Sequence, residues 1–385
     1  MTGADWQAGG FGLYVHWPFC AAKCPYCDFN SHVTAGVDHR RWAAAFLSEL
    51  RRNAVRTPGR VLNAVFFGGG TPSLMDPDTV GAILAEARRL WPAANDMEVT
   101  LEANPTSVEA EKFRAFRDAG VNRVSMGVQA LNDDDLRRLG RRHSAAEAMA
   151  AFDVARGLFD RVSFDLIYAR QGQSLAAWRD ELRRALTLAV DHLSLYQLTI
   201  EPGTAFGDRH ARGGLRDLPD DDSAADLYDA TQEICAARGL AAYEVSNHAA
   251  PGAESRHNLI YWRYGDYVGI GPGAHGRITT RDGRMATETH RLPDQWLAQA
   301  EAGNGDSLTA PLPLPDQAIE YLMMSLRLSE GTDRTRLARL GLLPDPVVLS
   351  HLSGLGLLDV TPARLTATQA GRRVLNAVLR DLLAG

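Results

Sequence analysis

Three cysteines stand close together near the start of the chain, in the segment FCAAKCPYCDF. Cys20, Cys24 and Cys27 are separated by three and two residues, so one loop can bring their thiolates to a single compact centre. Thiolates are soft ligands that favour zinc, copper(I) or iron-sulfur clusters. The fourth cysteine, Cys235, lies in the helical pattern TQEICAARG and is expected to be a small buried hydrophobic residue. The loop therefore predicts a metal centre with three cysteine ligands.

Two kinds of metal centre fit such a loop. A structural zinc ion normally takes four protein ligands, and His16, Asp28 or His32 could supply the fourth. A four-iron cluster held by three cysteines keeps one iron free for a ligand that does not come from the protein. The spacing of the cysteines does not decide between them.

Glycines and polar residues follow the apolar runs that come next in the chain. The glycines of GGGTP, residues 68–72, allow positive φ and a close approach of the backbone to a ligand, but the segment matches neither the phosphate-loop pattern nor G-x-G-x-x-G. Polar residues inside otherwise apolar strands are costly to bury without partners, so their recurrence near strand ends predicts a ligand there. They are Glu102, Gln129, Asp165 and Gln197, and Arg141 is expected to reach the same region as a partner for a carboxylate.

The elements that must position these residues alternate between strands and helices. β-branched and aromatic runs alternate with amphipathic stretches such as RWAAAFLSELRRNA, which is typical of βα units around a parallel sheet. The sequence predicts an α/β fold, a partial (β/α)6 barrel, with a doubly wound open sheet as the alternative. The expected strands are 13–17, 64–68, 98–103, 123–129, 161–167 and 192–200.

The remainder of the chain is less regular. Residues 201–308 are rich in glycine and are expected to cover the barrel mouth, and TAPLPLPD, residues 309–316, is expected to be a linker. After it, three helical segments, a strand pair and a closing helix predict a winged-helix-like α+β module.

Composition narrows the class of protein. Among 385 residues, 45% are hydrophobic and the formal net charge is −6, which favours a globular protein and argues against a nucleic-acid partner. The first ten residues lack a cationic start and an apolar run, and no stretch of about 18 apolar residues occurs, so a signal peptide and a transmembrane span are not expected. A cytoplasmic location follows as the expectation, with peripheral membrane contact and a homodimer left open.

The C-x3-C-x2-C loop after the first strand and GGGTP after the second resemble the radical S-adenosylmethionine (SAM) superfamily. The resemblance implies a 4Fe-4S cluster on the three cysteines, with SAM chelating the free iron. It also implies a radical SAM core at 1–240, an extension at 241–308 and the winged-helix-like domain at 316–385. The residues that it implies as SAM contacts are Tyr14, Gly69, Gly70, Thr71, Glu102, Gln129, Arg141 and Asp165.

Within the superfamily, LYVHWPFC, TLEANP and SMGVQALNDDDLRRLGR resemble the oxygen-independent coproporphyrinogen III oxidase family and its heme chaperone branch. The oxidases carry a further cysteine two positions after the third one, where this chain has Phe29. HNLIYW, residues 257–262, matches the HNxxYW pattern of the heme chaperone branch. Another departure is Ala169, Arg170 and Gln171, where relatives commonly have Gly-Leu-Pro.

The pattern HNLIYW predicts a heme site, because histidine can ligate iron and flat rings can face the macrocycle. The candidates are His257, Tyr261 and Trp262, with His248 and His275 as rival ligands. The resemblance thus implies a heme chaperone whose partners are heme, heme-acceptor proteins and an electron donor. The alternative function is oxidative decarboxylation of coproporphyrinogen III, which Phe29 argues against.

Overall fold

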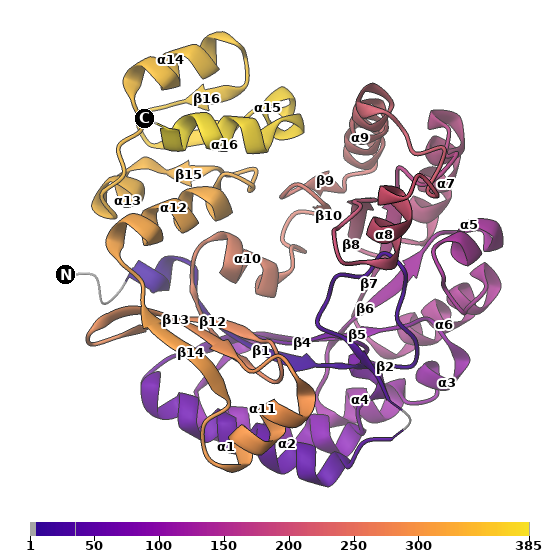
Figure 1. The fold of residues 1–385 in the computed structure, drawn as a ribbon, viewed down its shortest axis with the longest axis vertical. Helices are drawn as coiled ribbons and strands as arrows, with labels where there is room; N and C mark the ends of the chain where they lie inside the picture. The colour runs from indigo at the N-terminus through magenta and orange to yellow at the C-terminus, as the bar shows by residue number, and fades with distance from the viewer. Residues whose placement is uncertain (1–4, 35, 385) are drawn as a thin grey trace.

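The computed structural model describes residues 5–34 and 36–384, except the side chains of 107 and 108. Its centre is a curved sheet in which six parallel strands follow one another in chain order, β1-β4-β5-β6-β7-β8, with helices on the outside (Figure 1). A doubly wound sheet would reverse this order at a switch point, so the barrel prediction is confirmed. The six strands are β1 (Phe11–Trp17), β4 (Leu62–Gly69), β5 (Ala93–Ala103), β6 (Arg123–Gln129), β7 (Arg161–Tyr168) and β8 (His192–Gln197).

The outer helices bury one apolar face each against the sheet. In the first of them, α1 (His39–Arg56), Trp42, Phe46 and Leu50 recur at helical spacing and are buried, while the arginines at positions 40, 41 and 51 are exposed. Burying one such side chain contributes about 1.5–3 kcal/mol, so this face fixes the helix on the sheet. The other outer helices are α2 (Pro77–Leu90), α3 (Ser107–Ala110), α4 (Phe113–Ala119), α5 (Asp133–Arg138), α6 (Ala145–Leu158) and α7 (Leu175–Leu188).

The segment after β8 continues the sheet at both ends. Beyond β8 lie the antiparallel strands β10 (Asn247–Ala249) and β9 (Ala241–Ala242). At the other end, β11 (Asp266–Ile270) pairs in parallel with β1 and is followed by antiparallel β12 (His275–Thr280), β13 (Gly283–Thr289) and β14 (Asp306–Pro311). The helices of this region are α8 (Ala205–Ala211), α9 (Asp221–Ala237), α10 (Arg256–Trp262) and α11 (Pro293–Glu301).

The prediction of a linker at 309–316 is wrong in part. Residues 306–311 form the edge strand β14, and α12 already begins at Leu314. An edge strand tolerates Pro311 at its end because it needs hydrogen bonds on one side only. Its pairing with β13 is a tertiary contact, which proline content does not reveal.

The C-terminal module has its own hydrophobic cluster, built on residues such as Leu322, Leu337, Leu365 and Val378. Helices and a three-stranded sheet β15-β17-β16 surround it, which agrees with the predicted α+β pattern. Its elements are α12 (Leu314–Ser325), β15 (Thr332–Asp333), α13 (Arg334–Arg339), α14 (Pro346–Gly354), β16 (Leu358–Val360), β17 (Arg364–Ala367), α15 (Gln369–Arg373) and α16 (Leu375–Ala384).

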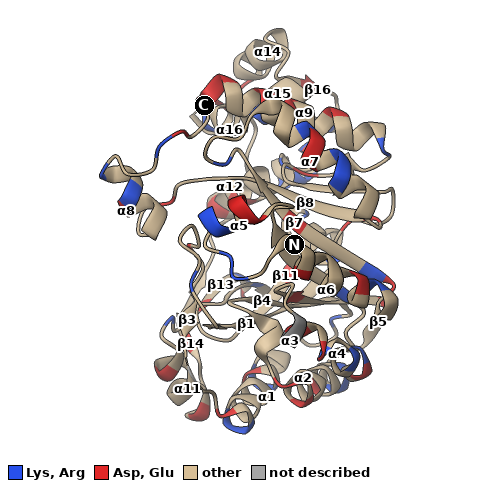
Figure 2. Cartoon of the chain, turned by 90° about the vertical axis from the view of Figure 1, so that its right-hand side faces the viewer, with Lys and Arg blue, Asp and Glu red and all other residues tan. Residues whose placement is uncertain are grey.

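Acidic and basic residues both occur on the outer helix α5 in Figure 2, whereas β1 and β4 carry neither. None of the helices in the described part of the chain is long and apolar enough to cross a membrane.

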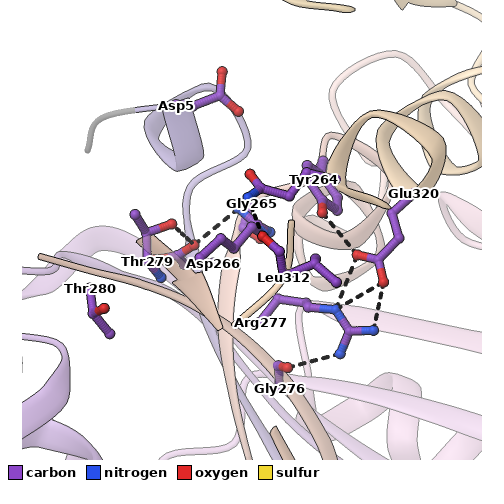
Figure 3. Close-up of polar contacts among 12 residues, drawn as sticks. Asp5, Tyr264, Gly265, Asp266, Gly276, Arg277, Thr279, Thr280, Leu312 and Glu320 are labelled. Carbon is purple, nitrogen blue, oxygen red and sulfur yellow. Dashed lines mark hydrogen bonds and ion pairs between the residues drawn. The ribbon is translucent and has the colours of Figure 1, made fainter. Parts of the chain in front are cut away.

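A polar junction fastens the C-terminal module to the sheet extension (Figure 3). Glu320 of α12 accepts hydrogen bonds from Arg277 Nη2 at 2.8 Å and from Tyr264 Oη at 2.8 Å. Arg277 belongs to β12, and Tyr264 lies in the turn between α10 and β11. The junction therefore connects the module to the two segments that carry His275 and HNLIYW.

We predict that Glu320→Ala lowers the free energy of unfolding by about 2–4 kcal/mol, because it leaves a largely buried guanidinium and a hydroxyl unpaired. Glu330→Ala is the matched control, since Glu330 pairs with Arg263 at a site where both side chains are about 40% exposed, and it should cost less than about 1 kcal/mol. Urea denaturation of both variants measures the difference. Equal losses would contradict the role of the buried junction.

Candidate functional site

The cysteine loop lies inside the crescent of the sheet (Figure 1). Cys20 ends the short strand β2 (Phe19–Cys20), and Cys24 and Cys27 occupy the loop before β3 (His32–Val33). All three thiols are partly exposed and line one cavity of about 150 Å³. Among the described residues, no three His, Cys, Asp or Glu side chains come close enough to hold a single metal ion. Cys235, in contrast, is fully buried in α9, as expected.

The glycine segment at the end of β4 packs directly on the cysteine loop. A Cβ atom on Gly70 would lie 2.7 Å from the backbone oxygen of Phe19, and one on Gly69, where φ is +111°, would lie 2.6 Å from the ring of His16. The backbone N–H of Gly70 donates to Trp17, and that of Thr71 donates to Phe19. This contact leaves no room for a Cβ atom, which explains why both positions are glycine.

Two partly buried carboxyl groups, on β5 and β7, face the same cavity. Glu102 accepts a hydrogen bond from the backbone N–H of Gly69 at 3.2 Å. Burial and the nearby charge of Asp165 raise the pKa of Glu102 to about 8. Burial likewise raises the pKa of Asp165 to about 6. Since neither carboxylate is matched by a full ion pair, the cavity favours a ligand that brings positive charge or hydroxyl donors.

Arg141 and Gln129 complete the polar wall of this cavity. The Arg141 guanidinium donates to Asn104 Oδ1 at 2.7 Å and to the Gly127 oxygen at 2.8 Å, and it lies 3.4 Å from Cys24 Sγ. Gln129 has a φ of +71°, and its Oε1 is buried with no hydrogen-bond partner. A strained strand end and an orphaned amide oxygen indicate a position shaped for a ligand.

The structure thus brings together seven of the eight expected SAM contacts and all three cysteines around the first cavity. The exception is Tyr14, which lines the neighbouring cavity instead. Gln197 ends β8 as an exposed residue outside the lining of either cavity. Sequence reasoning missed Asn104 and Ser125, although Asn104 stands in the quoted LEANP segment directly after a strand.

A capping box at the start of α3 forms only in part. The backbone N–H of Glu109 is 3.4 Å from Thr106 Oγ1. The Glu109 carboxylate, however, accepts from Ser73 and from the backbone N–H of Asn104 rather than returning to the helix start. Gly120 caps α4 in the left-handed region.

A second cavity of about 470 Å³ adjoins the first and shares Phe29, Gly69 and Glu102 with it. This aromatic cavity is lined by Tyr14, His16, Phe29, Asn30, Phe66, Gly69, Glu102, Tyr261, Tyr267, Gly273, His275, Glu288, Thr289 and Arg291. Its volume lies within the range of small-molecule pockets, roughly 300–1,000 Å³. Phe29, at the position where the oxidases have cysteine, is 57% exposed and forms part of both linings.

The HNLIYW residues point in different directions from α10. Tyr261 lines the aromatic cavity. His257 lies behind the wall, stacked on Phe66 with ring centroids 4.2 Å apart, and burial lowers its pKa to about 3. Trp262 faces the C-terminal module, where the Arg327 guanidinium lies 4.8 Å from its ring centre. The three residues therefore do not form one binding surface.

The other candidate histidines are also separated. His248 is fully buried in β10, whereas His275 is exposed at the start of β12 and lines the aromatic cavity. His16 has both ring nitrogens occupied, by Tyr14 Oη at 3.0 Å and by the Asn30 oxygen at 2.9 Å. His32 lies 3.3 Å from Asn30 Oδ1, and Asp28 is exposed.

The turn after β7 differs from the expected Gly-Leu-Pro type and is stabilised by charge. Ala169 has a φ of +57°, and the buried Arg170 donates to Asp135 at 2.8 Å, to Glu181 and to the Ile167 oxygen. The strand and Asp165 keep their place despite the changed turn.

Comparison with known proteins identifies the family. Residues 14–185 match the Radical SAM superfamily. Over 97% of its length the chain is 39% identical to the heme chaperone HemW of Escherichia coli K12, and it covers 98% of that protein. The chain belongs to the HemW family.

Other HemW relatives and one solved structure extend this result. HemW of Mycobacterium tuberculosis is 38% identical over 97% of the chain and 95% of its own length. The mitochondrial radical S-adenosyl methionine domain-containing protein 1 of Bos taurus is 38% identical over 97% of the chain and 87% of its own length. The structure of coproporphyrinogen III oxidase (HemN) from E. coli superposes with a TM-score of 0.80 at 24% identity, over 98% of this chain and 92% of that one, and so shares the fold.

The raised pKa of Glu102 gives a pH prediction for the ligand-free protein. The folded state holds this proton between the ordinary glutamate pKa of 4.5 and about 8, so stability falls as pH rises through that window. Glu102→Gln removes the titration, and the variant should lose less stability than the wild type from pH 5 to 8, by on the order of 1 kcal/mol per pH unit. Urea midpoints across this range test it.

The exposed Glu111→Gln is the control for that experiment and should follow the wild-type profile. Parallel profiles for Glu102→Gln and wild type would show that Glu102 is ionised throughout.

Proposed function

We propose that the chain is a heme chaperone, which binds heme and delivers it to acceptor proteins from a radical SAM scaffold with a 4Fe-4S cluster and SAM. The observation that carries the proposal is the aromatic cavity beside the thiol-lined one, with Phe29 between them. An aromatic wall suits a flat macrocycle, and the open polar cavity suits a cationic ligand.

The residues of the first cavity fit the cofactors that the superfamily implies. Cys20, Cys24 and Cys27 would hold the cluster, and the partly buried Glu102 and Asp165 would face the cationic groups and hydroxyls of SAM. A reduced cluster held there would supply an electron for cleavage of SAM, whereas in a carrier SAM would only shape the heme pocket. Arg141 is held beside Cys24 and Asn104, where a guanidinium would orient the methionine carboxylate.

The alternative is oxygen-independent oxidation of coproporphyrinogen III. Phe29 disfavours it, because this position carries a cysteine in the oxidases and a bulky, exposed ring here. Relatives that match over nearly the full length are named heme chaperones, which also favours delivery over decarboxylation.

We further propose a cytoplasmic location, partnership with heme acceptors and an electron donor, and no nucleic-acid partner. We divide the chain into a radical SAM core at 1–240, an extension at 241–308 and a C-terminal domain at 316–385. The same proposal includes peripheral membrane contact and a homodimer.

Cys24→Ser should abolish cluster assembly, because two thiolates and a hydroxyl bind the cluster far more weakly than three thiolates. Iron and sulfide content after anaerobic reconstitution measures it, with a drop from about four irons per chain to background. Cys235→Ala, in which a buried cysteine outside the cavity is removed, is the control and should keep the cluster. Zinc with no sulfide in the wild type would contradict the cluster.

The proposed function is tested by titrating the reconstituted protein with heme and, separately, incubating it anaerobically with SAM, a reductant and coproporphyrinogen III. We expect saturable heme uptake near one per chain and no loss of porphyrinogen. Conversion of the porphyrinogen without stable heme uptake would reverse the proposal in favour of the oxidase.

A further inference from the structure

We propose that the heme iron is ligated by His275, within the aromatic cavity, and that His257 of HNLIYW supports the cavity wall from behind. This inference rests on the proposed heme-binding function and names the residue that would ligate the heme iron. The pattern HNLIYW alone would assign the ligand to His257, so the two histidines make opposite predictions.

The walls of the aromatic cavity suit a flat, largely apolar macrocycle. Tyr261 and Tyr267 meet edge to face with ring centroids 4.3 Å apart, and Tyr14 stacks against Phe66 at 6.3 Å. These four rings and the exposed Phe29 surround a space of about 470 Å³. Aromatic surfaces of this kind bury a conjugated ring system with little loss of side-chain entropy.

Elimination among the histidines leaves one free ligand in that lining. His16 and His275 are the histidines that line the cavity within the described part of the chain. The two ring nitrogens of His16 are already engaged by Tyr14 and Asn30. His257 lies outside the lining, with one ring face on Phe66 and a T-shaped contact to Tyr261 at 4.5 Å.

His275 has a carboxylate near one of its ring nitrogens, at a distance longer than a hydrogen bond. Its side chain is 59% exposed, and its Nδ1 faces Glu288 Oε1 at 3.7 Å across the β12–β13 pair. Histidines that ligate metals commonly direct their other ring nitrogen at a carboxylate, which fixes the tautomer and raises the basicity of the ligating nitrogen. With Nδ1 facing Glu288, Nε2 is left for the iron.

The backbone before His275 is held firmly in place. Thr289 Oγ1 accepts from the backbone N–H of Ala274 at 2.8 Å and donates to the Gly271 oxygen at 2.5 Å. A Cβ atom on Gly271 would lie 2.2 Å from the backbone oxygen of His16, so this turn packs directly on β1. A ligand on such a turn keeps its position when the iron arrives, which lowers the entropic cost of binding.

The charges of the cavity give the macrocycle an orientation. Its lining contains the carboxyl groups of Glu102 and Glu288 and one described guanidinium, that of the exposed Arg291. The two propionates of heme are therefore expected to point toward Arg291 at the rim, away from Glu102 on the inner side.

The test compares His275→Ala with His257→Ala by heme titration, with the absorption and electron paramagnetic resonance spectra of ferric heme as readouts. We expect His275→Ala to weaken heme binding at least tenfold, to lose the spectrum of imidazole-ligated iron, and to regain that spectrum when free imidazole is added. His257→Ala should keep the ligation spectrum, with at most a few-fold loss of affinity because Tyr14, Phe66 and Tyr261 lose a packing partner.

Iron and sulfide content and far-ultraviolet circular dichroism serve as folding controls for both variants. The inference is overturned if His275→Ala keeps the wild-type spectrum, or if His257→Ala loses it and imidazole restores it. Absence of heme uptake by the wild-type protein would instead refute the proposed heme-binding function itself.

Discussion

The arrangement of both cavities depends on one close contact between two backbones. The glycines that end β4 lie against Phe19 and His16 at distances that exclude any Cβ atom, and two backbone hydrogen bonds fix the segments together. Because the cysteines follow Phe19 directly, the contact sets where their thiols lie relative to the strand ends. Glu102 is tied into the same contact through the backbone N–H of Gly69. A bulkier residue would separate the thiols from the carboxyl groups that share their cavity.

Much of the first cavity could be predicted because its residues follow local patterns. Alternating apolar runs locate the strands, and parallel strands bring their carboxyl ends to one edge, so Glu102, Gln129 and Asp165 meet there. The second cavity could not be predicted in this way. Tyr14 and Tyr267 stand on neighbouring strands, β1 and β11, that are joined by residues 18–265 of the chain. The pairing of β11 with β1 is therefore a tertiary contact. The direction of α10, which turns His257 inward and Trp262 outward, is likewise set by packing against Phe66 and Arg327.

Electrostatics distinguishes the two cavities. The first holds carboxyl groups whose pKa values burial raises to about 8 and about 6, so the ligand-free fold carries an unfavourable charge environment. The second is lined mainly by rings and contains neutral histidine, since burial lowers the pKa of His16 to about 4. Binding of a cationic ligand would therefore stabilise the fold around the first cavity. Binding of a flat apolar macrocycle would stabilise the fold around the aromatic cavity. The two cavities meet at Phe29, Gly69 and Glu102, which line both of them.

Asn30 has an unusual reach for a single side chain. Three residues after Cys27, its amide donates to the oxygens of Pro272 and Arg291, which are 242 and 261 positions further along the chain. Arg291 lines the aromatic cavity, and Pro272 lies three positions before His275, which also lines it. The amide therefore connects the segment that follows the cysteines directly to the segment before His275 and to Arg291. A displacement of the cysteine segment would be transmitted to the aromatic cavity through these two hydrogen bonds.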